Sequence, residues 1–281
     1  MQKVLKKYFP VFAGPTLIAF FIAFLAPFVI GVYLSFSKFT TVTDASFEGV
    51  DNYIKAMTER QRFGQALFFT VLVTVVAIIT VNLCAFGLAY LLTRKLKGTN
   101  FFRTVFFMPN LIGGIVLGYT WQVMINAILA KYGTTLIADY RYGFVGLILL
   151  MNWQMIGYMM IIYIAGLQNV PPELVEAATL DGAGRGQVLR HVTLPMIMPS
   201  ITICLFLTLA NSFKTYDANL ALTAGAPRHQ TEMLALNIVD TFYGRMGQEG
   251  VGQAKAVIFF LIVAVIALGQ LYVTRRKEVE Q

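Results

Sequence analysis

Long apolar runs are the feature that most constrains this chain. Runs such as "GLILLMNWQMIGYMMIIYIAGL" and "MIMPSITICLFLTLA" carry no charge, and about 20 apolar residues suffice for a helix to cross a bilayer. Of the 281 residues, 57% are hydrophobic and 13% are charged, whereas a soluble domain carries about 25% charged residues. The runs therefore exclude one or two soluble domains and predict an all-α integral membrane protein.

Hydropathy predicts about six transmembrane helices. The basic N-terminus looks like the start of a signal peptide, but its apolar run is too long and lacks a small-residue cleavage site. We therefore expect an uncleaved first span. The predicted spans are 11–36, 66–93, 104–128, 142–167, 194–217 and 254–274.

Basic residues indicate the orientation of the spans. "RKLKG" follows the second span and "RRK" follows the last, and positive charge next to a span end marks the cytoplasmic side. Both termini are therefore expected in the cytoplasm, with Lys38 as an exception just outside the first span. The net charge of +8 is not gathered into one patch, so nucleic acid is not an expected partner.

Catalytic and metal chemistry are not expected in this chain. His191 and His229 fall on opposite sides of the membrane in the predicted topology, and no Ser-His-Asp set or HExxH motif is present. Cys84 and Cys204 lie inside apolar runs, where cysteine is a small packing residue. The outer stretch "FEGVDNYIKAMTERQRFGQA" is expected to form an amphipathic helix, which either meets another protein or covers the bundle.

A polar insert, "EAATLDGAGRGQVLRHVTLP", separates the fourth and fifth spans. Pro172 suits the first turn of a helix, where a missing N–H costs nothing. Gly182 and Gly184 favour its end, because glycine adopts the left-handed cap conformation. We expect a short helix over 172–181.

Two interpretations of this short helix follow from the residues alone. Leu174, Ala177 and Ala178 are spaced to share one face, which suits either an interfacial helix lying on lipid or a slim ridge docking in a groove of another protein. A helix lying on lipid normally carries more lysine and arginine on its polar face, so the weak basic content favours docking.

The spacing of the insert resembles a known loop. Glu176-Ala177-Ala178, three residues, Gly182, nine residues, Val192, one residue and Leu-Pro resemble the "EAA" loop of membrane subunits of ABC importers, with valine in place of isoleucine. The resemblance implies that this loop couples the chain to an ATPase. The coupling residues would be Glu176, Ala177, Ala178, Asp181, Gly182, Leu194 and Pro195.

Other stretches extend the resemblance over nearly the whole chain. "FRTVFFMPNLIGGIVLGYTWQVMIN" is similar to the third span of the sugar-importer branch, and "NSFKTYDANLALTAGAP" with "GVGQAKAVIFFLIV" is similar to the last two spans of the maltose-type first permease subunit. Gly186 and Leu189 replace residues that are usually aromatic, which implies a re-shaped contact with the ATPase. Ala226 replaces the second glycine of the usual Thr-x-Gly-Gly-Pro.

The resemblance implies a permease subunit with a type I ABC importer transmembrane fold in a bacterial plasma membrane. Residues 1–65 would form the first span and outer loop, 66–274 the ABC transmembrane type-1 domain with its coupling helix at about 172–186, and 275–281 a cytoplasmic tail. Its partners would be a second, different permease, two cytoplasmic ATPases, an extracellular solute-binding protein and membrane lipid. The chain lacks a GxxxxGK[ST] loop, so it would bind no cofactor itself, and ATP and Mg would sit on the ATPases.

Polar residues inside the spans are candidates for the substrate path. A sugar needs amide or carboxylate partners for its hydroxyls and an aromatic face for its ring. The alternative is hydrogen bonding between helices and anchoring at the membrane interface. Asn82 and Gln122 are open to the same two interpretations, and an ion pair with each other is a further alternative for Lys214 and Asp217. The candidates are Trp121, Asn126, Asn152, Gln154, Tyr158, Asn211, Tyr216 and Asp217.

A carbohydrate, expected to be a di- or oligosaccharide, is the predicted substrate, while the particular sugar is left open. Glycerol phosphate and polyamines are alternatives within the ABC class. An ion-coupled secondary transporter would need ionisable residues deep in the spans and usually an internal repeat, and neither is clear. A membrane scaffold or insertase-like protein is the third alternative.

Overall fold

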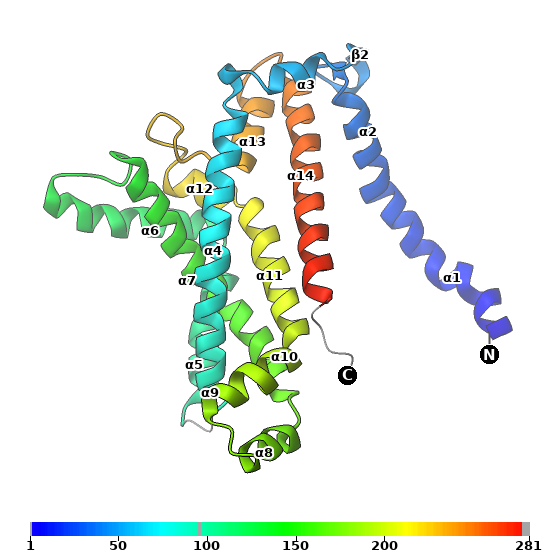
Figure 1. The fold of residues 1–281 in the computed structure, drawn as a ribbon. Helices are drawn as coiled ribbons and strands as arrows, with labels where there is room; N and C mark the ends of the chain where they lie inside the picture. The colour runs from blue at the N-terminus through cyan, green and yellow to red at the C-terminus, as the bar shows by residue number, and fades with distance from the viewer. Residues whose placement is uncertain (1, 95–96, 277–281) are drawn as a thin grey trace. The chain divides into compact units, whose positions relative to one another are not determined.

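The computed structural model describes residues 2–94 and 97–276 and is almost entirely helical (Figure 1). Among these residues the one sheet is the antiparallel pair β1 (Ser37–Lys38) and β2 (Ser46–Phe47). The all-α prediction is therefore confirmed. Lys95 and the predicted tail beyond Arg276 lie outside the described residues. The chain forms two compact units, which we call the first unit (Met1–Phe63 with Ile238–Phe260) and the second unit (Gly64–Asn237 with Leu261–Gln281).

The first unit begins with the predicted first span. A π-helical turn, Phe21–Leu25, joins α1 (Gln2–Phe20) to α2 (Ala26–Leu34) in one continuous helix. The predicted outer helix is shorter than expected, because it ends with the six residues of α3 (Asp51–Ala56) and gives way to a 3-10 turn, Glu59–Gln61. Parts of α13 (Leu234–Gly244) and α14 (Glu249–Arg275) complete this unit.

The second unit is a helical bundle. Its helices are α4 (Phe63–Leu92), α5 (Thr99–Phe107), α6 (Gly114–Leu129), α7 (Tyr140–Gln168), α8 (Pro172–Leu180), α9 (Arg185–Val188), α10 (Leu194–Met196), α11 (Met198–Phe213) and α12 (Asp217–Leu222).

Four of the predicted spans are helices long and apolar enough to cross a bilayer, namely Val11–Leu34, Phe63–Leu92, Tyr140–Gln168 and Glu249–Arg275. The third and fifth are not the continuous helices that hydropathy predicts. Thr99–Leu111 and Gly114–Tyr132 meet at 102°, and Arg185–Met196 and Met198–Phe213 meet at 71°. The count of six spans holds only if each bent pair is one crossing.

Proline lies at both bends, together with glycine at the first. Pro109 lies in a 3-10 turn, Met108–Leu111, and the next helix starts only at Gly114. In the fifth span, Pro195 lies just before the break at Ile197 and Pro199 just after it. A proline removes a helical hydrogen bond and its ring clashes with the preceding turn, so hydropathy remains high where the helix cannot continue.

The core of the second unit is built on α4 and α7. Phe69 and Phe86 of α4 meet Phe144 and Tyr163 of α7 edge to face. Small residues along one side of α4 allow close approach of its neighbours, as in other membrane bundles. These fully buried positions are Val73, Ala77, Val81, Ala85 and Ala89.

Hydrogen bonds between buried polar side chains join the same helices. The Tyr163 hydroxyl donates to Asn82 Oδ1 at 2.9 Å, and Asn82 Nδ2 donates to Thr208 Oγ1 at 3.2 Å, which links α7, α4 and α11. Asn152 Nδ2 donates to Thr80 Oγ1 at 2.9 Å, which links α7 to α4 again. Asn82 and Asn152 therefore make the interhelical contacts that were the alternative to a substrate role.

Asn219 in α12 holds the chain segment that follows that helix. Its side chain is fully buried and donates from Nδ2 to Thr223 Oγ1 at 3.1 Å and to the Thr231 carbonyl at 2.8 Å. Its Oδ1 accepts from the backbone N–H of Met233 at 2.9 Å. One amide thus closes the loop between α12 and α13.

Replacing Asn219 with alanine should destabilise the protein without touching its predicted functional residues. The Met233 N–H and the Thr231 carbonyl would be left buried without these partners, which costs about 1–3 kcal/mol for each group. The midpoint of thermal unfolding in detergent should fall by several degrees. Asn100→Ala, at an exposed asparagine, is the matched control, and equal midpoints for the two variants would contradict this role of Asn219.

Candidate functional site

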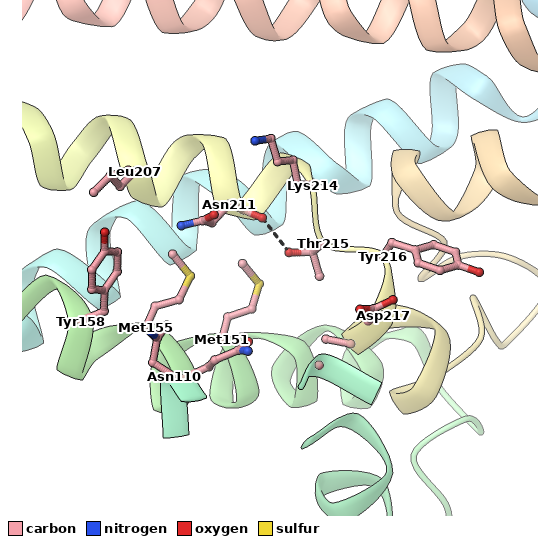
Figure 2. Close-up of a pocket in the computed structure, with 13 residues that line it drawn as sticks. Asn110, Met151, Met155, Tyr158, Leu207, Asn211, Lys214, Thr215, Tyr216 and Asp217 are labelled. Carbon is pink, nitrogen blue, oxygen red and sulfur yellow. Dashed lines mark hydrogen bonds between the residues drawn. The ribbon is translucent and has the colours of Figure 1, made fainter. Parts of the chain in front are cut away.

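A cavity of about 520 Å³ lies in the second unit, where two interruptions of helical structure meet (Figure 2). Its wall comes from the break between α5 and α6, one face of α7, the end of α11 and the start of α12. The lining residues are Asn110, Gly114, Met151, Gln154, Met155, Tyr158, Leu207, Asn211, Lys214, Thr215, Tyr216, Asp217 and Ala218.

The helix breaks explain why a cavity forms here. Non-helical backbone at membrane depth leaves amide groups that must be buried in protein or face water, so broken helices in membrane proteins tend to line cavities. Asn110 lies in the turn that follows α5, and Gly114 is the first residue of α6. Asp217 opens α12 three residues after the Lys214 cap of α11.

Close packing around the cavity depends on two glycines. A Cβ at Gly157 in α7 would overlap the carbonyl oxygen of Phe106, so the backbones of α5 and α7 are in direct contact at this glycine. A Cβ at Gly118 in α6 would lie 2.6 Å from Cβ of Ala221, so α12 rests directly on α6. These contacts fix the helices that carry the cavity wall.

Polar side chains face this cavity from two helices. Gln154 and Tyr158 come from α7 and Asn211 from α11. None of the three side chains hydrogen-bonds to another residue within the part of the chain that the structure describes. The dashed contact in Figure 2 joins Thr215 Oγ1 to the Asn211 backbone carbonyl at 3.1 Å and leaves the Asn211 amide uncommitted. The three groups are therefore available to a ligand.

The two charged residues of the cavity, Lys214 and Asp217, lie on opposite sides of Thr215 and Tyr216 in the chain. Both are exposed, and the described part of the chain shows no ion pair between them. Pairing, the alternative considered for these two residues, is thus not what the structure shows. An ammonium and a carboxylate instead add a donor and an acceptor to the cavity.

The cavity brings together five of the eight predicted substrate-path residues: Gln154, Tyr158, Asn211, Tyr216 and Asp217. In Figure 2 the ring of Tyr216 points away from the other labelled side chains. Contact between these five residues and the substrate stays a prediction.

The other three path candidates have structural contacts elsewhere. Trp121 packs edge to face on Trp153, with ring centroids 5.7 Å apart. Asn126 Oδ1 accepts from the backbone N–H of Leu136 at 2.8 Å and holds the loop before α7. Asn152 bonds to α4, as described above. Gln122 likewise donates to the Leu222 carbonyl at 3.0 Å.

Sequence reasoning missed Asn110, Gly114 and Thr215 as cavity residues. The string "MPNLIGG" carries a signal that would have found the first two, because Pro, Asn and a Gly-Gly pair mark a turn inside an apolar run. Thr215 carries no such mark. Its place follows from the end of α11 at Phe213, which the hydropathy profile does not show.

The polar insert forms the predicted short helix. α8 starts with Pro172 in its first turn and ends at Leu180, and Gly182 follows with a φ of +84°. The helix over 172–181 is therefore confirmed, but the wider range of about 172–186 contains two helices, since α9 starts at Arg185. Gly184 precedes α9 rather than ending α8, and its N–H donates to Gln187 Oε1 at 2.7 Å.

α8 presents apolar and acidic side chains outward. Leu174 is 45% exposed and Leu180 is 82% exposed. Glu176, Ala177 and Asp181 are also exposed. Ala178 is half-buried, as are Leu194 and Pro195 in α10. An exposed helix with leucines on its surface has the character of a docking element.

Two hollows flank α8. One, of about 300 Å³, is lined by Ala178, Asp181 and Gly182 together with Gln187, Val188 and His191 among others. The second, of about 390 Å³, lies between α8 and the end of α4, where Arg94 sits over the Tyr90 ring at 4.7 Å. Gly186 opens onto empty space, since a Cβ there would meet no atom within 4 Å. α8 follows the end of α7 at Gln168, whereas the α7 residues that line the cavity, Met151 to Tyr158, lie earlier in that helix.

Comparisons with known proteins agree with this arrangement. "Probable starch degradation products transport system permease protein AmyD" of Thermoanaerobacterium thermosulfurigenes is 42% identical over 277 residues, covering 96% of this chain and 94% of the relative. "Multiple sugar-binding transport system permease protein MsmF" of Streptococcus mutans is 30% identical and covers 99% of both chains.

A solved structure shares the fold. A chain of a bacterial ABC transporter involved in the import of the acidic polysaccharide alginate superposes with a TM-score of 0.82 at 21% identity, covering 98% of both chains. The predicted type I ABC importer fold is thereby confirmed, while the cytoplasmic placement of both termini stays a prediction. A family profile matches residues 97–279. Helices, bends and profile together show that the chain belongs to the family of binding-protein-dependent transport system inner membrane components.

Proposed function

We propose that this chain is the permease subunit of an ATP-binding-cassette importer for a di- or oligosaccharide. The observation that carries the proposal is the combination, in one unit, of a cavity with uncommitted polar groups and an exposed helix with the full Glu-Ala-Ala to Leu-Pro spacing. The name of the 42% identical relative refers to starch degradation products, so malto-oligosaccharides are the first substrates to test.

The chemistry of the cavity suits a carbohydrate. Gln154 and Asn211 offer amide donors and acceptors, Asp217 offers a carboxylate acceptor, and Tyr158 offers a ring face and a hydroxyl. Met151, Met155 and Leu207 supply the apolar part of the wall. The volume of about 520 Å³ lies within the range of about 300–1,000 Å³ that small-molecule sites have.

Transport would be powered by partners. ATP and Mg are assigned to two cytoplasmic ATPase subunits, and this chain is assigned no cofactor. A second, different permease would complete the translocation path, and an extracellular solute-binding protein would deliver the sugar. In this proposal the complex lies in the bacterial plasma membrane with both termini of this chain in the cytoplasm, and residues 66–274 form the transmembrane domain between the first span with its loop (1–65) and the tail (275–281).

The exposed helix α8 would transmit the work of the ATPases. Closure of the ATPases on ATP would press on α8, whose leucines and alanines would enter a groove in that partner. α8 is joined to α7 by only three residues and to α11 through α9 and α10. Movement of α8 would therefore shift the two helices that bear Gln154 and Asn211, alternating access by rigid-body motion.

Uptake into membrane vesicles tests the proposed function. Vesicles that hold this chain, its partner permease and the ATPases should accumulate maltotriose only with internal ATP and external binding protein. Omitting the ATPases is the control. Uptake that persists without them and follows an ion gradient would identify a secondary transporter and overturn the proposal. Uptake of glycerol phosphate or a polyamine in place of maltotriose would retain the ABC class and reject the carbohydrate.

A further inference from the structure

A second cavity, of about 400 Å³, lies in the first unit and shares no lining residue with the candidate substrate cavity described above. It is enclosed by the β1–β2 segment, α3, the turn Glu59–Gln61 and the start of α14. Its lining is mixed: Phe39 and Val251 are apolar, and the charged side chains are the cations Lys38, Lys55 and Arg60 and the carboxylate Glu48.

Two nearly buried amides form a fixed floor. Asn52 is 4% exposed and donates from Nδ2 to the carbonyls of Ser35 and Ser37 at 3.1 and 2.9 Å. Gln61 is also 4% exposed and donates from Nε2 to Gln248 Oε1 at 2.8 Å. A Cβ at Gly250 would overlap the Ser37 carbonyl, so α14 begins in direct contact with this floor.

A buried lysine supports the floor from below. Lys255 is fully buried in α14, and its Nζ donates to the Gln61 carbonyl at 3.2 Å and to Thr241 Oγ1 at 2.7 Å. Arg245 Nη1 donates to Gln61 Oε1 at 3.4 Å and pairs with Asp240 at 2.9 Å. These bonds hold the turn at Gln61 against α13 and α14, so the cavity is a built feature and not a gap between loops.

The charges of this cavity are unequally compensated. Lys55 Nζ lies 2.5 Å from Asp51 Oδ2, and this hydrogen-bonded carboxylate raises the pKa of Lys55. Lys38 and Arg60 are exposed, and neither forms an ion pair with a residue that the structure describes. The negative charge of Glu48 also raises the pKa of Lys55. Two cations at the rim are thus left for a negative group from outside.

The predicted topology places this cavity outside the cell. Its lining residues from Lys38 to Gln61 lie in the loop that follows the first span, and those from Gly247 to Val251 lie at the end of the loop before the last span. With both termini in the cytoplasm, as the sequence predicts, both loops are extracellular.

We infer that the cavity framed by Lys38, Arg60, Asn52 and Gln61 is a docking point for a carboxylate-bearing loop of the extracellular solute-binding protein. The inference rests on the proposed function, which supplies such a partner on this side. A neutral saccharide has no charge to pair with Lys38 and Arg60, whereas an acidic side chain would pair with both. The side-chain amides of Asn52 and Gln61 already donate to other groups of this chain, so the two cations are the main contacts left for a ligand. Charges of this kind guide encounter and fix orientation between proteins.

The test uses the complete transporter in nanodiscs, with ATPase activity measured as a function of added binding protein. The double variant Lys38→Glu, Arg60→Glu should raise the half-stimulating concentration by about tenfold or more, because attraction becomes repulsion. Basal activity and the rate at saturation should stay as in the wild type. The salt dependence of stimulation should weaken, and the exchanged pair Lys38→Arg, Arg60→Lys should retain most of the wild-type response.

Lys131→Glu is the matched control. Lys131 is an exposed lysine that does not line this cavity, and it lies in the loop before α7, whereas α8 follows the other end of that helix. An unchanged half-stimulating concentration in the double variant, or an equal rise with Lys131→Glu, overturns the docking point. A defect that appears only in nanodiscs with anionic lipid assigns the cations to lipid headgroups and overturns it too. A wild-type transporter that ignores the binding protein altogether is a different outcome, because it contradicts the proposed function itself.

Discussion

Replacing Gly182 with valine should abolish ATP-driven transport while leaving the permease inserted and folded. Gly182 follows α8 with a φ of +84°, a conformation that costs a residue with a Cβ about 1–2 kcal/mol and a β-branched residue more. A Cβ there would meet no atom within 4 Å, so the strain would be relieved by turning the end of α8. The helix that the ATPase is expected to grip would then point elsewhere.

Co-purification of the ATPases with the tagged permease should fall by about tenfold or more, since each 1.4 kcal/mol corresponds to a factor of ten, and maltotriose uptake should fall to background. The thermal midpoint of the isolated permease should change little. Gly133→Val is the matched control for co-purification, because Gly133 also has a positive φ, of +69°, and a Cβ there would also meet nothing, but it lies in the loop before α7, away from α8. Gly182→Asn should be intermediate, because asparagine tolerates the left-handed region. Full ATPase recovery with Gly182→Val would show that α8 is not the docking element.

The sequence predicted α8 well because its boundaries are local. Pro172 starts the helix and Gly182 ends it, and both effects act within a turn of the residue itself. The prediction that the third and fifth spans are straight was wrong, because it rested on hydropathy alone. Hydropathy is averaged over a window of residues and does not register the local effect of Pro109 or Pro195 on the backbone.

The candidate cavity shows what a helical pattern leaves undetermined. Asn152 and Gln154 are two positions apart in α7, which places them about 200° apart around a helix of 3.6 residues per turn. They cannot both face one cavity, and the structure turns Asn152 to α4 and Gln154 to the cavity. The sequence alone shows that Asn152 and Gln154 do not share a face of α7. Which of the two faces the cavity depends on where α4 packs. Gln154 and Tyr158, four positions apart, share a face as the pattern predicts.

Membership of the cavity lining also depends on contacts distant in sequence. Trp121 and Trp153 are both plausible partners for a sugar ring, yet they pack on each other. Asn126 finds a backbone N–H ten residues away, at Leu136. A polar or aromatic residue in an apolar run is therefore a sound candidate for some buried contact, while tertiary packing decides between another helix and a ligand.

Replacing both Gln154 and Asn211 with leucine should severely weaken sugar transport. The two amides line the same cavity from α7 and α11 and hydrogen-bond to no other residue that the structure describes. Their loss therefore leaves no protein group without its partner, whereas a bound saccharide would lose partners for its hydroxyls. Each lost hydrogen bond is worth about 0.5–1.5 kcal/mol, so the pair should raise the KM for maltotriose uptake by about tenfold or more.

Asn152→Leu supplies the crossed comparison, because Asn152 lies on the opposite face of the same helix and bonds to Thr80. That variant should lower the thermal midpoint in detergent and leave KM unchanged, whereas Gln154→Leu with Asn211→Leu should leave the midpoint unchanged and raise KM. ATPase stimulation by unliganded binding protein should persist in both, since α8 is untouched. An unchanged KM in the double variant would move the sugar path out of this cavity, and a raised KM in Asn152→Leu would place it against α4 instead.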